Sequence, residues 1–179
     1  MATVIPQHAV KSIRQMLELL DEHCGGKNFL FRGQREDKPL LPRIARLKFD
    51  EGAKREEVER RMFEDFRRQS HPYVDIRPDN DWDWLALAQH HGMATRLLDW
   101  TSNPLAALWF ATQRPAENGA PAVVWILEIS EDDYVQSKTN ADPWKVDRTR
   151  VFRPTHITRR IIAQNGWFTA HAFVRTTDF

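Results

Sequence analysis

The spacing of apolar residues predicts helices in the first half of the chain. Apolar side chains recur every three or four residues before the Gly25-Gly26 pair, which is typical of a helix end: Val10, Ile13, Leu17 and Leu20. Residues 51–69 are highly charged but carry an apolar side that also fits a helix, formed by Val58, Met62, Phe63 and Phe66. A third helix is expected over 82–91.

This third segment carries apolar residues on two faces, which predicts a buried helix. Asp81 is the expected N-cap, and Gly92 is the expected stop. A further helix should begin at Asn103-Pro104, because Asn caps a helix and Pro suits its first position. Residues 157–164 fit a short helix, and residues 38–49 are broken by Pro and expected to be irregular.

Alternating or continuous apolar runs predict strands between these helices. The expected strands cover residues 28–34, 94–101, 121–129, 150–154 and 166–173. The order of helices and strands does not follow a regular βαβ repeat. The pattern therefore favours an α+β fold, with a split or mixed sheet and flanking helices.

Length and composition narrow the class of protein. A chain of 179 residues suits one domain, and its net charge of +1 gives no overall field that would attract nucleic acid or a membrane surface. No apolar run approaches the roughly 20 residues of a membrane span. The N-terminus lacks the layout of a signal peptide, and Cys24 is the single cysteine. We expect a soluble, cytoplasmic protein without a disulfide.

The stretch from Ala88 to Ala111 is the richest in chemistry. A predicted strand ends there in Thr101, Ser102 and Asn103, and a helix begins just after them. The first N–H groups of a helix favour an anion. Arg32 lies on an earlier strand beside Gly33, which would let a ligand approach the backbone closely. If the two strands are neighbours, these residues form a phosphate-binding clamp.

A structural explanation of the same residues is equally open. Thr101, Ser102 and Asn103 would then only cap the helix, and Asp99 would pair inside the fold with Arg96 or Arg32. His90 and His91 are adjacent, so they do not share a helix face and are a poor pair of metal ligands. His91 is either a core residue at a helix end or a ligand-contacting imidazole. We expect no metal site.

Four motifs resemble the FRG domain family, in the same order along the chain. They are FRGQ (31–34), LLPRIAR (40–46), LALAQHHGMATRLLDWTSNPLAALWFA (85–111) and RIIAQNGWFTAH (160–171). The resemblance implies a single FRG domain over 1–179, with its core motifs in 28–173. Family members look like bacterial and phage-associated proteins. Ala94 stands where the family usually has Pro, and members often continue past the last motif, so it stays open whether a C-terminal segment is absent.

More remotely, the order of elements is similar to the ADP-ribosyltransferase fold, which binds NAD. This similarity places Arg32 at the first functional position and Thr101 with Ser102 at the second. Gln164 is expected at the third, with Glu128 as the alternative. NAD would then be the co-substrate, held by Arg32, Gly33, Gln34, Thr101, Ser102 and Asn103. Arg96, Asp99, Trp100 or His91 would contact the substrate or the acceptor.

Three function classes follow from these features. The first is an ADP-ribosyltransferase-like toxin or phage-defence effector, which transfers ADP-ribose to a protein or nucleic-acid acceptor. The second is a non-catalytic module that binds a nucleotide or phosphate ligand as a sensor or partner protein. The third is a nucleic-acid-associated protein, supported only by the arginines of 55–68, which alternate with glutamates. The sequence sets no oligomeric state.

Overall fold

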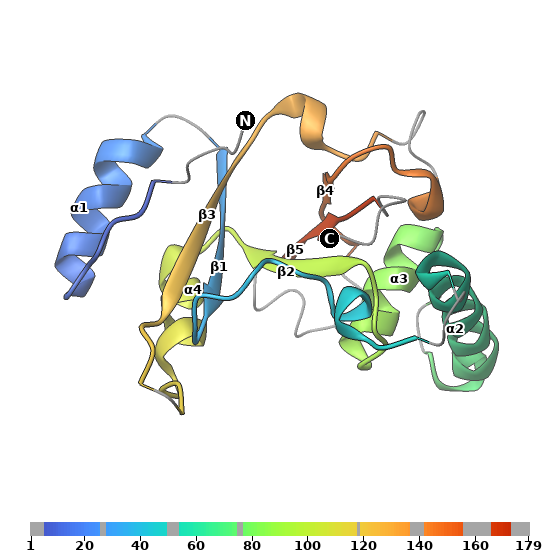
Figure 1. The fold of residues 1–179 in the computed structure, drawn as a ribbon. Helices are drawn as coiled ribbons and strands as arrows, with labels where there is room; N and C mark the ends of the chain where they lie inside the picture. Colours follow the sequence, from blue (N-terminus) through green and yellow to red (C-terminus); the bar gives the residue numbers. More distant parts are fainter. Residues whose placement is uncertain are drawn as a thin grey trace.

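The computed structural model describes residues 6–25, 28–49, 54–74, 77–117, 119–136, 142–155 and 166–172. Within them the chain forms four α-helices and one five-stranded antiparallel sheet, which confirms the α+β class (Figure 1). The helices are α1 (Ile13–Cys24), α2 (Arg55–Ser70), α3 (Asp81–His90) and α4 (Pro104–Thr112). The strands are β1 (Asn28–Gln34), β2 (Leu97–Thr101), β3 (Val123–Ile129), β4 (Arg150–Phe152) and β5 (Gly166–Ala170).

The sheet is split between β1 and β2. Its strand order is β3-β1-β2-β5-β4, and all four pairings are antiparallel. Every residue of β1 is in register with β3, and every residue of β2 is in register with β5. Between β1 and β2 the register is limited to Phe31 and Thr101. The two halves of the sheet therefore meet at one point and diverge from it.

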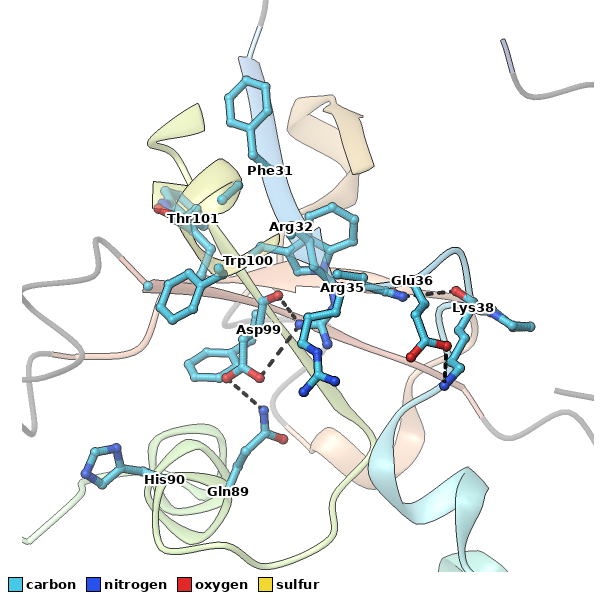
Figure 2. Close-up of a pocket in the computed structure, with 18 of the residues that line it drawn as sticks. Phe31, Arg32, Arg35, Glu36, Lys38, Gln89, His90, Asp99, Trp100 and Thr101 are labelled. Carbon is cyan, nitrogen blue, oxygen red and sulfur yellow. Dashed lines mark hydrogen bonds and ion pairs between the residues drawn. The ribbon is translucent and has the colours of Figure 1, made fainter. Parts of the chain in front are cut away.

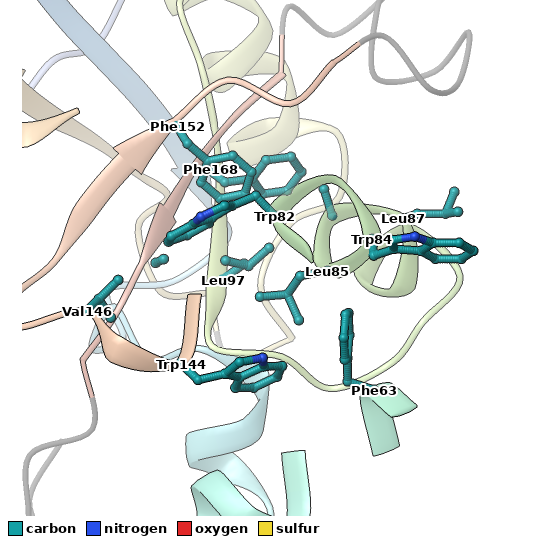
Figure 3. Packing of buried hydrophobic residues seen from close by; sticks show 12 residues of the cluster. Phe63, Trp82, Trp84, Leu85, Leu87, Leu97, Trp144, Val146, Phe152 and Phe168 are labelled. Atoms are coloured by element: carbon teal, nitrogen blue, oxygen red, sulfur yellow. The ribbon is translucent and has the colours of Figure 1, made fainter. Parts of the chain in front are cut away.

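Helix α3 lies in the main hydrophobic core, as its two apolar faces predicted. All residues from Trp82 to Ala88 are buried. Figure 3 shows Leu85 of α3 surrounded by aromatic side chains from elements far apart in the sequence, including Phe63 of α2 and Trp144 of the 3-10 turn Pro143–Lys145. The N-cap of α3 is Asn80, whose side chain accepts a hydrogen bond from the Asp83 N–H, so the expectation of Asp81 was wrong by one residue.

Helix α2 buries one charged residue along with its apolar side. Phe63 and Glu59 are both buried, so the charged side of this helix is not entirely exposed. Glu59 Oε1 accepts from the backbone N–H of Arg96, and Glu59 Oε2 accepts from Arg96 Nε at 3.0 Å. This buried ion pair fixes α2 to the start of β2.

Helix α4 packs against β1 at Gly33. A Cβ atom at this position would lie 1.9 Å from the carbonyl oxygen of Ala107. Gly33 is therefore needed for the close approach of α4, a requirement that the sequence did not indicate. The predicted Asn103 cap of α4 is confirmed, because the Asn103 side chain accepts from the N–H groups of Leu105 and Ala106.

Candidate functional site

A pocket of about 700 Å³ opens where β1 and β2 diverge. Its size falls within the range of small-molecule sites in proteins. Four cationic side chains line it, from β1, the loop that follows, and the 3-10 turn Arg43–Arg46: Arg32, Arg35, Lys38 and Arg46. Aromatic side chains form much of the remaining wall: Phe31, Trp100, Phe110, Trp167 and Phe168. This combination suits a ligand with a negative charge and a flat apolar ring.

Arg32 reaches across the gap from β1 to β2. Its Nη1 donates to the backbone oxygen of Asp99 at 2.7 Å and lies 3.9 Å from the Asp99 carboxylate. Burial lowers the pKa of Arg32 from its usual value; the Asp99 charge opposes this shift and the nearby Arg46 adds to it. The guanidinium remains charged, because an arginine pKa lies so far above neutral. An anion beside Arg32 would offset both the cost of burying the guanidinium charge and the repulsion from Arg46.

Three buried polar atoms along this stretch of β1 and its loop have no hydrogen-bond partner. They are Nε of Arg32, Oε1 of Gln34 and Nε of Arg35, and all three residues line the pocket. Buried polar atoms are nearly always paired with protein, water or a ligand, so a cluster of unpaired ones at a pocket is informative. The wall contributed by residues 32–35 therefore offers both donors and an acceptor to a bound molecule.

Asp99 lines the pocket and is linked to Gln89 of α3 (Figure 2). Gln89 Nε2 donates to Asp99 Oδ1 at 3.0 Å, and the Thr95 hydroxyl donates to the other end of the Gln89 amide. The Asp99 side chain is nevertheless 66% exposed. Its carboxylate is thus oriented by α3 while it stays open to a ligand.

A hydrogen-bonded chain runs behind the pocket wall. Trp100 Nε1 donates to the Thr169 hydroxyl at 2.9 Å, and Thr169 Oγ1 lies 3.0 Å from His171 Nε2. His171 Nδ1 lies 3.3 Å from the Thr149 hydroxyl, so both ring nitrogens of His171 have a hydroxyl neighbour within hydrogen-bonding distance. Burial, with a smaller contribution from the Arg32 charge, lowers the pKa of His171 to about 4. His171 is therefore neutral at physiological pH.

Sequence reasoning missed both Gln89 and His171. His171 continues the alternation of the GWFTAH segment, in which Thr169 and His171 share a side with Trp167. This alternation, beside the strand that carries Trp100, could have indicated that Thr169 and His171 lie next to that tryptophan. Gln89 carries no such pattern, because its role depends on how α3 packs beside β2.

The structure brings some of the predicted site residues together. Arg32, Gly33, Gln34, Asp99, Trp100 and Thr101 all line the pocket. Ser102 and Asn103 are not among its lining residues, and the side chain of Asn103 is engaged in capping α4. The helix N-terminus expected to complete a phosphate clamp is thus already capped. Gln164 lies outside the described residues.

Arg96 and His91 lie away from the pocket. Arg96 is 1% exposed, its Nη1 donates to the backbone oxygen of Pro143, and its guanidinium lies over the Trp144 ring. Of the two ion-pair partners predicted for Asp99, the structure shows Arg32, while Arg96 pairs with Glu59. His91 packs near the Phe66 ring, whereas the adjacent His90 lines the pocket.

The described residues contain no metal-ligand cluster and no helix that could cross a membrane. No group of three or more His, Cys, Asp or Glu side chains there is arranged to hold a metal ion. In the same part of the chain, no helix has both the length and the apolar character to cross a membrane.

Comparison with known proteins gives one family. The family model of the FRG domain matches residues 27–120, which is just over half of the chain and includes β1, the pocket loop, α3, β2 and α4. No curated protein and no solved structure shows a significant similarity. The matched range includes the motifs at 31–34, 40–46 and 85–111, which contain most of the pocket-lining residues. The chain belongs to the FRG domain family.

Proposed function

We propose that this FRG domain binds a nucleotide in the pocket and uses NAD as the donor in an ADP-ribosyl transfer. The proposal of nucleotide binding rests on the unpaired buried atoms of Arg32, Gln34 and Arg35. They lie in a pocket with four cationic side chains and an aromatic wall. Cationic guanidinium groups suit the pyrophosphate, and aromatic rings suit a base or a nicotinamide. The volume of about 700 Å³ leaves room for a dinucleotide.

The chain's own residues would have distinct tasks in this reaction. Arg32, with Arg35 and Arg46 near it, binds the pyrophosphate. Trp100 or Trp167 packs against the nicotinamide ring, and Thr101 lies beside the ribose. In the transfer, an acceptor oxygen or nitrogen forms a bond to C1′ of the ribose while the C1′–nicotinamide bond breaks. Nicotinamide leaves with the electron pair, and the acceptor loses a proton. Gln164 stays the predicted third residue, and the proposed acceptor is a protein or a nucleic acid.

The proposal is tested by incubating the pure protein with labelled NAD and cell extract. Label in protein or nucleic acid and the release of nicotinamide are both measured. Arg32→Ala should abolish both signals, and Arg32→Lys should retain a part, because Lys keeps the charge but not the paired donors. Arg14→Ala is the matched control, since Arg14 is an exposed arginine on α1 with a side chain 88% accessible. Full transfer by Arg32→Ala would contradict the assigned role.

A non-catalytic module is the second candidate, and one observation favours it. Both carboxylates that line the pocket have a polar neighbour: Glu36 lies 2.8 Å from Lys38, and Asp99 accepts from Gln89 and lies 3.9 Å from Arg32. Neither is placed as an unpaired base. Binding of ADP-ribose or NAD without any release of nicotinamide, by a folded protein in the presence of extract, would support the sensor or partner-protein function over the transferase.

A further inference from the structure

The pocket places a fixed carboxylate directly beside its cationic wall. Asp99 projects from β2 and Arg32 from β1. The two side chains face one another across the seam, by which we mean the gap between β1 and β2 (Figure 2). The separation of 3.9 Å between Arg32 Nη1 and Asp99 Oδ2 is too long for a hydrogen bond. Arg32 instead donates to the backbone oxygen of Asp99. The carboxylate therefore does not take up the hydrogen-bonding capacity of Arg32.

Gln89 orients this carboxylate through a hydrogen bond. The Thr95 hydroxyl donates to Gln89 Oε1, so the opposite end of the amide, Nε2, must point to Asp99 Oδ1. One carboxylate oxygen is thus tied to α3, while the side chain as a whole is 66% exposed. The other carboxylate oxygen, Oδ2, lies 3.9 Å from Arg32 Nη1, and Asp99 is one of the residues that line the pocket.

A carboxylate at this place is unfavourable for a simple phosphate. It repels an anion that approaches Arg32, and it offers nothing in return because a carboxylate only accepts hydrogen bonds. A ligand that gains from both sides must carry a negative group for Arg32 and hydrogen-bond donors for Asp99, a short distance apart. A phosphorylated ribose has this arrangement in its hydroxyl and phosphate groups.

We infer that Asp99, positioned by Gln89, is a subsite for ribose hydroxyls, which selects nucleotides and sugar phosphates over inorganic phosphate or pyrophosphate. The inference rests on the proposed function and makes it more specific. Gln89 is a positioning residue, because it acts on the ligand only through the Asp99 carboxylate. Asp99 thereby contacts the donor nucleotide, and it is not reserved for the acceptor.

The test compares two probes, ADP-ribose and inorganic pyrophosphate, by calorimetric titration of the full chain. Asp99→Asn should weaken ADP-ribose binding by about tenfold to hundredfold, the range for hydrogen bonds to a charged acceptor. The same change should tighten pyrophosphate binding by roughly threefold, because it removes a repelling charge. Gln89→Ala should weaken ADP-ribose binding by roughly threefold to tenfold and leave pyrophosphate binding unchanged.

Glu36→Gln is the matched control. It also removes one negative charge from the pocket lining, but Glu36 is paired with Lys38 and not held toward the seam. It should change the affinity for both probes in the same direction. Opposite effects of Asp99→Asn on the two probes would support the subsite.

The two proposals fail in different ways. If the native chain binds ADP-ribose and Asp99→Asn binds both probes at least as tightly, Asp99 is only a counter-charge and the subsite is wrong, while the proposed function stands. If the native chain binds pyrophosphate but not ADP-ribose, or binds neither probe, the nucleotide site itself is wrong and the subsite falls with it.

Discussion

Replacing Gly33 with alanine should destabilise the protein through α4. The added Cβ would lie 1.9 Å from the Ala107 carbonyl oxygen and 2.7 Å from the Ala111 nitrogen, both of them backbone atoms. Restoring an ordinary contact of 3.4 Å to Ala107 requires a shift of about 1.5 Å between α4 and β1. Overpacking of a core costs about 1–3 kcal/mol, and a backbone obstacle belongs at the upper end. We expect a loss of about 3 kcal/mol, which corresponds to a Tm lower by roughly 6–12 °C for a chain of this length.

Thermal and urea unfolding followed by circular dichroism measure this effect. Gly25→Ala is the matched control, because its Cβ would approach nothing closer than 3.4 Å and its φ of −63° suits alanine. That variant should stay within about 0.5 kcal/mol of the native chain. A Gly33→Ala variant with an unchanged Tm would refute the argument that this glycine is required by the helix contact.

Four further variants test other parts of the fold. Glu59→Gln should cost about 3 kcal/mol in urea unfolding because it leaves the buried Arg96 charge uncompensated, and Glu59→Met combined with Arg96→Met should recover most of that loss. The fold lowers the pKa of His171 from its ordinary value of 6.5 to about 4, so the unfolded chain takes up this proton first as the pH falls. The free energy of unfolding is therefore highest above pH 6.5 and decreases by at most about 3 kcal/mol as the pH falls to 4. His171→Gln should flatten the pH dependence of stability in that window. Asn103→Ala should lower the free energy of unfolding by about 1 kcal/mol and leave the affinity for ADP-ribose unchanged, because the side chain caps α4 and does not line the pocket.

The elements were largely predictable from local patterns. The strand at 28–34 has the predicted bounds, and the helix after Asn103-Pro104 begins where the cap and the proline indicated. The strand expected over 94–101 is shorter, because Arg96 at its start is engaged with Glu59 and β2 begins at Leu97. An Arg–Glu pair formed between segments 37 residues apart leaves no local mark in either of them. The short helix expected over 157–164 lies outside the described residues.

The site was predictable in part. A clamp between Arg32 and the end of the later strand required the two strands to be neighbours, and they are, through Phe31 and Thr101. The sequence could not show that the strands diverge from that point, since register depends on the whole sheet. It therefore assigned Ser102 and Asn103 to the ligand and overlooked Gln89 and His90, which α3 carries to the pocket from a segment that looked like core.

The split sheet has a mechanical consequence. One half, β3 and β1, carries Arg32; the other half, β2, β5 and β4, carries Asp99 and Trp167. A ligand that contacts both halves becomes a cross-link across a seam that strand pairing closes only between Phe31 and Thr101. Its binding free energy then adds to the cohesion of the sheet itself, so occupancy should slow amide exchange in β1 and β2 together and make unfolding of the two halves a more cooperative event.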